Sequence, residues 1–194
     1  MHKTIISDTS CFIILSKINE LDLLKKVYGQ IFTTPDIVEE FDEMLPEWVI
    51  VENVSDKSKQ RILELQIDRG ESSAIALALE MPKSTLILDD FKARKIAQQL
   101  GIPFTGTIGV IIKAKLNGII PSIKPYLEKI KETNFRISAE IELQALKEAQ
   151  EFLNSLDLRV NPKKKIHFPL PLHFAKNNYF CNLKFLSCQT RNTK

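Results

Sequence analysis

The stretch TIISD at residues 4–8 decides how the chain is organised, because it joins an apolar run directly to an aspartate. The stretch TLILDD at residues 85–90 repeats this pattern and ends in two aspartates. Short apolar runs of this kind are typical of buried strands in a parallel sheet. Because ligands of such sheets bind beyond the carboxyl ends of the strands, the two stretches predict acidic groups at one binding edge.

Helical segments alternate with the apolar runs along the whole body of the chain. We expect strands at 5–6, 30–33, 48–51, 85–89 and 104–105, and helices at 9–18, 20–27, 57–67, 71–80, 91–100, 107–116, 122–132 and 139–153. A further helix should begin after Thr34 as N-cap, with Pro35 at its first position. This alternation predicts an α/β fold whose mainly parallel sheet is covered on both faces by helices.

Composition limits the classes to which the protein can belong. At 194 residues the chain has room for one domain, and no apolar stretch approaches the length of a membrane span. The first residues lack the apolar core of a secretory signal, so we expect a soluble, cytoplasmic protein. Three scattered cysteines do not make a disulfide framework, and Cys11 reads as a small buried side chain.

The net charge of +3 hides a division of the chain into two segments. Residues 152–194 hold eight Lys or Arg and one acid, giving +7, whereas residues 1–151 carry −4. We therefore predict a domain over 1–151 and a basic, aromatic-rich, poorly ordered extension over 152–194. Zinc binding by the histidines and cysteines of the extension is disfavoured because their spacing matches no common finger. Nucleic-acid binding through Lys163–Lys165 stays open.

Four acidic positions in the body can carry chemistry: Asp8, Glu40, Glu71 and the pair Asp89-Asp90. Magnesium prefers oxygen ligands and is held by a few carboxylates together with substrate phosphate. Carboxylates gathered without a metal would raise one another's pKa values. Singly, each has an ordinary structural role, since Asp8 can cap a helix, Glu40 can face solvent and Glu71 can favour a helix start. Their joint placement predicts a divalent-metal site for phosphodiester chemistry.

Several motifs resemble those of PIN-domain nucleases, and in particular a bacterial and archaeal PIN-like subgroup. They are SDTS at 7–10, TPDIVEEF at 34–41, GESSAIALA at 70–78, LILDD at 86–90 followed by AR at 93–94, and GTIGV at 106–110. The resemblance covers about residues 4–151 and is carried by the order and spacing of the motifs together.

The resemblance implies a three-layer α/β/α sandwich with a ribonuclease site that depends on Mg²⁺ or Mn²⁺. Many such proteins are toxins of toxin–antitoxin pairs, inhibited by a small antitoxin protein and often dimeric. Asp8, Glu40, Glu71 and Asp90 match the acidic positions of the family, with Asp8 and Asp90 as principal metal ligands. Asp89 is able to share or take the role of Asp90.

Besides the choice between Asp89 and Asp90, the choice between Glu39 and Glu40 stays open, and a further point concerns position 71. Glu39 can replace Glu40, because adjacent helical residues point about 100° apart and only one can face the pocket. Glu71 departs from the pattern of many relatives, which carry an aspartate further along the chain. This departure and the acidic body favour an alternative function, a catalytically weak or inactive PIN-like module that binds RNA or a protein partner.

Polar and basic neighbours of the acids are candidates for substrate binding. Thr9, Ser10, Thr105 and Thr107 can hydrogen-bond a carboxylate or metal-bound water, although Thr9 and Thr107 can equally cap helices. Arg94 can contact RNA phosphate and so offset the acidic body. For Lys92 and Lys95, which follow the aspartate pair on the same helix, we favour a solvated helix face.

Other chemistries fit the sequence less well. The body holds one histidine, His2 at its terminus, so a Ser-His-Asp or Cys-His system has no base. Neither a Walker-type phosphate loop nor a dinucleotide fingerprint is present. The leading hypothesis is therefore a metal-dependent endoribonuclease.

Overall fold

The computed structural model describes residues 4–152, and the predicted extension beyond this range lies outside the described residues. Its centre is a five-stranded sheet in the order β3-β2-β1-β4-β5. The strands are β1 (Ile5–Ser7), β2 (Ile31–Thr33), β3 (Val49–Val51), β4 (Thr85–Ile87) and β5 (Phe104–Thr105). Each neighbouring pair is parallel, as the sequence predicted.

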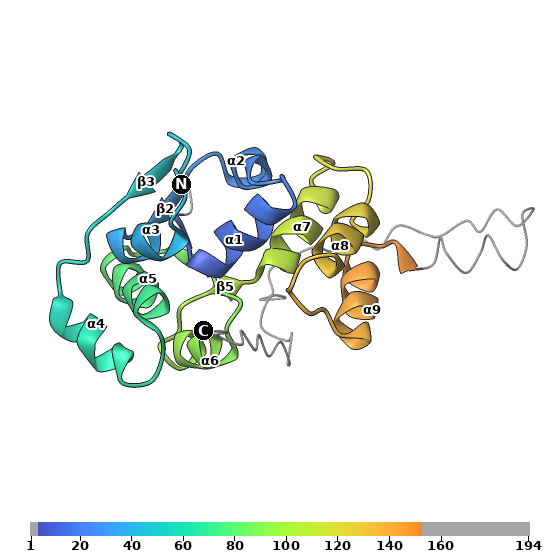
Figure 1. The fold of residues 1–194 in the computed structure, drawn as a ribbon. Coiled ribbons are helices and arrows are strands. Elements are labelled where there is room, and N and C mark those ends of the chain that lie inside the picture. Colours follow the sequence, from blue (N-terminus) through green and yellow to red (C-terminus); the bar gives the residue numbers. More distant parts are fainter. Residues whose placement is uncertain (1–3, 153–194) are drawn as a thin grey trace, which may run out of the picture.

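Helices cover both faces of the sheet, so the fold is the expected α/β/α sandwich (Figure 1). They are α1 (Thr9–Lys17), α2 (Asp22–Tyr28), α3 (Pro35–Phe41), α4 (Lys57–Glu64), α5 (Arg69–Glu80), α6 (Phe91–Gln99), α7 (Thr107–Leu116), α8 (Lys124–Lys131) and α9 (Ala139–Glu148). Helices α7, α8 and α9 lie together at one end of the molecule, and α4 lies at the other. None of the helices in the described range combines the length and hydrophobicity that a membrane span requires.

The strand order places a topological switch point between β1 and β4. From β1 the chain first builds β2 and β3 on one side, and then returns to build β4 and β5 on the other. Residues Ile5 and Ser7 of β1 stand opposite Thr85 and Ile87 of β4, so the two strands end level with each other. In open α/β sheets the ligand crevice lies at this point, outside the carboxyl ends of the strands.

The core forms where α1 and α3 pack over the sheet. Phe12 is fully buried, and its ring centroid lies 5.7 Å from that of Phe41 on α3. Helix α3 begins as predicted, because Thr34 caps it by accepting a hydrogen bond from Ile37 N and Pro35 occupies its first turn. These contacts fix where α1 and α3 begin, and hence where Asp8 and Glu40 lie.

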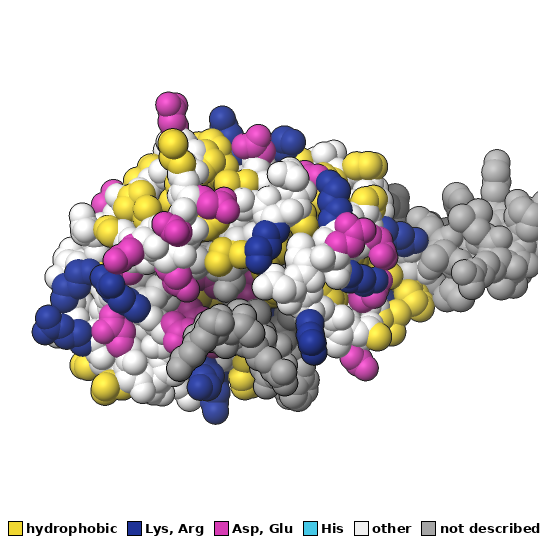
Figure 2. Space-filling view, in the orientation of Figure 1, with side chains coloured by type: hydrophobic (Ala, Val, Ile, Leu, Met, Phe, Trp, Pro, Cys, Tyr) yellow, Lys and Arg dark blue, Asp and Glu magenta, His cyan; other side chains and the backbone are white. Residues whose placement is uncertain are grey.

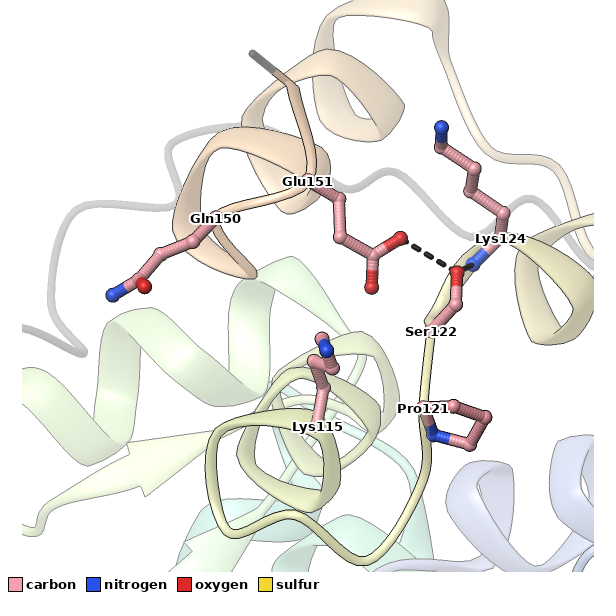
Figure 3. A pocket seen from close by; sticks show the side chains of 6 residues that line it. All are labelled: Lys115, Pro121, Ser122, Lys124, Gln150 and Glu151. Atoms are coloured by element: carbon pink, nitrogen blue, oxygen red, sulfur yellow. Dashed lines mark hydrogen bonds between the residues drawn. The ribbon is translucent and has the colours of Figure 1, made fainter. Parts of the chain in front are cut away.

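The last helix ends earlier than its amphipathic pattern predicted, at Glu148 instead of residue 153. Gln150 adopts a left-handed conformation with φ of 61°, which breaks the helix. Glu151 then turns back and accepts hydrogen bonds from Ser122 Oγ at 2.6 Å and Ile123 N at 2.8 Å, at the start of α8 (Figure 3). The buried carboxylate therefore closes the domain at the point where helical periodicity would continue.

The packing of α1 predicts a large cost for truncating Phe12. Phe12→Ala should lower the free energy of unfolding by about 3–5 kcal/mol, because it leaves a cavity against α3. Urea denaturation measures this change. Leu65→Ala, at a side chain that is 83 % exposed, is the matched control and should change stability by less than about 0.5 kcal/mol. Equal stability of the two variants would contradict the packing described.

Candidate active site

Asp8 joins the ends of the two strands at the switch point. It follows β1 directly and caps α1, where its Oδ1 accepts a hydrogen bond from Cys11 N at 3.1 Å. Its Oδ2 accepts a hydrogen bond from Asp89 N, also at 3.1 Å, beyond the end of β4. Burial raises the pKa of Asp8 well above its usual value, and the nearby charges of Asp89 and Glu71 raise it further.

Asp89 points into the protein and is neutralised there. Its Oδ1 accepts hydrogen bonds from Arg94 Nη2 and Thr107 N, both at 3.1 Å, and its Oδ2 accepts one from Thr107 Oγ1. Arg94 is itself buried, and its Nε donates to Leu88 O at 2.6 Å. The structure thus directs Arg94 to a buried ion pair with Asp89 and links the ends of β4 and β5 through them.

Gly106 makes room for this buried pair. A Cβ atom at position 106 would overlap Arg94 Nη2 and would lie 2.7 Å from Asp89 Oδ1. Both neighbours are buried and have little space in which to move. The glycine of the GTIGV motif is therefore required by the close approach of the ion pair, a role that the motif alone did not assign.

Asp90 faces the other way from its neighbour. It is partly exposed, and its Oδ1 caps α6 by accepting a hydrogen bond from Ala93 N at 2.9 Å. The two adjacent aspartates therefore differ in environment. Asp89 is hydrogen-bonded inside the fold, whereas Asp90 reaches the surface at the start of α6.

The two adjacent glutamates of α3 are also separated by their partners. Glu40 Oε2 accepts a hydrogen bond from Thr9 Oγ1 at 2.7 Å, directly after Asp8 in the chain. Glu39 instead accepts a hydrogen bond from Arg69 Nη1 at 3.2 Å. The geometry thus brings Glu40 to the acidic group and directs Glu39 away from it.

Helix α5 brings the last acid to the group through a close approach of its backbone. A Cβ atom at Gly70 would overlap Glu40 Oε2 and lie 3.1 Å from Thr9 Oγ1. The next residue, Glu71, occupies the third position of the helix and accepts a hydrogen bond from Asp68 N at 3.2 Å. Burial, together with the charges of Asp90, Asp68 and Glu40, raises the pKa of Glu71 to about 7. Mutual repulsion of the acids, which the sequence predicted, is therefore present.

The remaining predicted polar residues fall into two groups. The hydroxyls of Thr9 and Thr107 donate to Glu40 and Asp89, so both residues support carboxylates instead of capping their helices. Ser10 is partly exposed on α1. Thr105 is buried at the end of β5, where its Oγ1 donates to Gly106 O at 3.4 Å.

The acid group matches the ligand preference of a hard divalent cation. Its donors are all carboxylate oxygens, and the pKa of the nearby Cys11 thiol is raised by burial, which keeps this sulfur protonated. As the side chains stand, no three acidic, histidine or cysteine residues in the described range are grouped closely enough to hold a metal ion. Glu40, Glu71 and Asp90 all reach the surface, so their carboxylates have room to turn toward one.

Carboxylates follow the strands on both sides of the switch point of this all-parallel sheet, the place where α/β proteins bind their ligands. A comparison with protein families matches residues 4–151 to a family described as PIN domain, and the chain belongs to this family. This match confirms the resemblance seen in the sequence and agrees with the observed α/β/α fold; PIN domains are generally nucleases. Comparisons with curated proteins and with solved structures found no match.

The buried pair predicts that Arg94 acts on folding before it acts on any ligand. Arg94→Met should lower the free energy of unfolding by about 3–5 kcal/mol, because it leaves the Asp89 carboxylate buried without its partner. The double variant Arg94→Met/Asp89→Asn should recover part of this loss, as urea denaturation would show. A stable Arg94→Met protein with weakened RNA binding would instead make Arg94 a phosphate contact.

The raised pKa of Glu71 predicts a pH-dependent stability in the metal-free protein. A folded pKa of about 7, above the usual value of 4.5, means that the folded state holds the proton more tightly. The protonated Glu71 therefore stabilises the folded state fully when the pH is below 4.5, and this stabilisation is lost as the pH rises through about 7.

Glu71→Gln removes this titration while its amide oxygen still accepts from Asp68 N. The melting temperature of Glu71→Gln, relative to the parent in EDTA, should therefore rise between about pH 5 and about pH 8. Glu47→Gln, at an exposed position, should show no such trend. Parallel curves for Glu71→Gln and the parent would contradict the prediction.

Proposed function

We propose that the protein is a Mg²⁺- or Mn²⁺-dependent endoribonuclease that hydrolyses RNA phosphodiester bonds. The observation that carries the proposal is an uncompensated acidic group at the switch point. Asp8, Glu40, Glu71 and Asp90 lie around this point without forming a closed ligand cluster in the described residues, and the nearby Arg94 guanidinium is already paired with Asp89. Figure 2 shows acidic side chains gathered on the face over α3 and α5.

The contacts suggest separate roles for the acids. Asp8 and Asp90 would be the principal ligands, because they follow adjacent strands and are held by helix-capping hydrogen bonds. Glu40 and Glu71 would complete the site directly or through metal-bound water. Asp89 would act as a positioning residue, since Arg94 and Thr107 already occupy its oxygens while its backbone N–H holds Asp8.

The bound cations would activate the attacking water and stabilise the leaving oxygen of the phosphodiester. The protein itself contributes orientation. The two backbone hydrogen bonds to Asp8 fix its carboxylate, and Thr9 holds Glu40 toward the same crevice. Ser10 and Thr105 remain candidates for hydrogen bonds to the substrate.

Family membership supports further proposals about the setting of this activity. RNA is the proposed substrate, and a small antitoxin protein is the proposed inhibitor of a toxin-like enzyme in the cytoplasm. A homodimer is the proposed assembly.

A non-catalytic module that binds RNA or a protein partner is the second candidate. The glutamate at position 71 and the negative charge of the body favour it, as does the spread of the acids in the described residues. The two candidates differ in whether a divalent cation binds and supports turnover.

Replacing the central ligand should separate them. Asp8→Asn should lower Mn²⁺-dependent cleavage of a labelled single-stranded RNA by about 100-fold or more, because it removes a ligand charge. In the parent, saturating Mn²⁺ should stabilise the fold by about 2–3 kcal/mol at a concentration near 100 times Kd, whereas Asp8→Asn should lose most of this gain. Asp22→Asn, on the exposed side of α2, should behave as the parent in both measurements.

Each result has a clear reading. Equal cleavage by Asp8→Asn and the parent would refute the proposed site. A parent protein whose melting temperature responds to neither Mn²⁺ nor Mg²⁺ would favour the non-catalytic module.

A further inference from the structure

Phe91 is an aromatic side chain left at the surface. It is 48 % exposed, whereas the other phenylalanines that the structure describes are buried or partly buried. Single exposed apolar side chains are common on protein surfaces, so it is the surroundings of Phe91 that make its ring a candidate for contact with a ligand. Its surroundings indicate which ligand.

The position of Phe91 ties it to the acidic crevice. It is the first residue of α6 and is bonded directly to Asp90, a proposed metal ligand. A group that rests on this ring would therefore lie beside the start of α6, which Asp90 caps.

Polar side chains continue the same face of the helix. Lys95 and Gln98 follow Phe91 at i+4 and i+7, which places all three on one side of α6, and both are exposed. Ala93 and Ala97 occupy the opposite, buried side. Within the described range, Lys95 enters no ion pair and the Gln98 side chain makes no hydrogen bond. We call Phe91, Lys95 and Gln98 the outer face of α6.

We propose that the outer face of α6 binds one nucleotide of single-stranded RNA beside the acidic crevice. The base stacks on the Phe91 ring, the adjacent phosphate meets the Lys95 ammonium, and the Gln98 amide hydrogen-bonds a base edge or the sugar. This inference rests on the proposed function, because it names the form of RNA that the site accepts. Aromatic rings and cations arranged together are the usual means of holding unpaired bases.

The chemistry of this face fits a nucleotide better than a protein surface. A stable protein interface covers about 800 Å² on each partner and is built around an apolar centre. On the exposed side of α6, Phe91 stands among Lys92, Lys95, Gln98 and Gln99, and the exposed apolar side chain of Leu100 lies at the opposite end of the helix. Lys92 and Lys95 are both exposed on α6, and their charges offset the repulsion of RNA phosphates by the acidic residues.

Binding of an oligonucleotide tests the inference without cleavage. Full-length protein carrying Asp8→Asn is titrated, in Mg²⁺, into a fluorescein-labelled single-stranded oligoribonucleotide of mixed sequence, and anisotropy gives Kd. Adding Phe91→Ala should weaken binding by about 5- to 150-fold, the loss expected for one stacked base. Phe91→Trp should retain binding, whereas Phe91→Leu should not restore it, because leucine keeps an apolar surface without a stacking face.

The salt dependence of binding separates the two contacts. Lys95→Ala should reduce the slope of log K against log salt by about 0.7, the value for one phosphate of a single strand, and Phe91→Ala should leave the slope unchanged. Leu100→Ala is the matched control, since Leu100 is 44 % exposed at the far end of the same helix, and it should change neither quantity. The melting temperatures of all these variants should match that of their Asp8→Asn parent.

Three outcomes would overturn the inference: RNA binding unaffected by Phe91→Ala, full rescue by Phe91→Leu, or no binding of the oligonucleotide by the Asp8→Asn protein. Unchanged RNA binding together with lost binding of a protein partner would assign the ring to that partner. Binding that depends on Phe91 in a protein that never cleaves would refute the ribonuclease and support the nucleotide site. Cleavage with binding that is independent of Phe91 would do the reverse.

Discussion

The hydrogen bonds of one buried carboxylate organise the whole site. Asp8 accepts one N–H from the first turn of α1 and another from Asp89, so that a single side chain joins a helix start to the ends of two adjacent strands. Its charge is costly in this position, as its raised pKa shows. The remaining acids are arranged around it: Glu40 is held by the residue after Asp8, and Glu71 adds to its charge environment. The two backbone donors, one to each oxygen, act against this cost by favouring the ionised form of the buried carboxylate.

Much of this arrangement was predictable from local pattern. The apolar runs ending in Asp8 and Asp89 predicted parallel strands, and the helix start at Thr34-Pro35 follows from capping chemistry that operates over a few residues. Local pattern could not decide between Glu39 and Glu40. The choice depends on Arg69 and Thr9. Both lie far from α3 in the sequence and become its neighbours only when the helices pack.

The buried pair of Asp89 and Arg94 shows the same limit more strongly. In the sequence Arg94 is a cation beside acids, a pattern that equally suits phosphate binding. Its actual direction depends on Leu88 O and on the space left by Gly106, which belongs to the next strand–helix connection. The early end of α9 has a similar cause. Glu151 accepts hydrogen bonds from residues at the start of α8, which lie 28 and 29 positions earlier in the sequence. Periodicity describes one helix face and carries no information about such distant partners.

The two glycines with close neighbours, Gly70 and Gly106, have different effects: Gly70 affects the acidic site, and Gly106 affects folding. At position 70 an added methyl group would meet the free end of the exposed Glu40 side chain, which can swing away while the core stays intact. At position 106 the same methyl group would press on two buried charged groups that have nowhere to go. Any side chain larger than glycine is therefore disfavoured at positions 70 and 106 because of its volume, whatever its polarity. A substitution at position 70 would give a folded protein in which Glu40 is displaced. A substitution at position 106 would prevent stable folding and so reduce the amount of soluble protein.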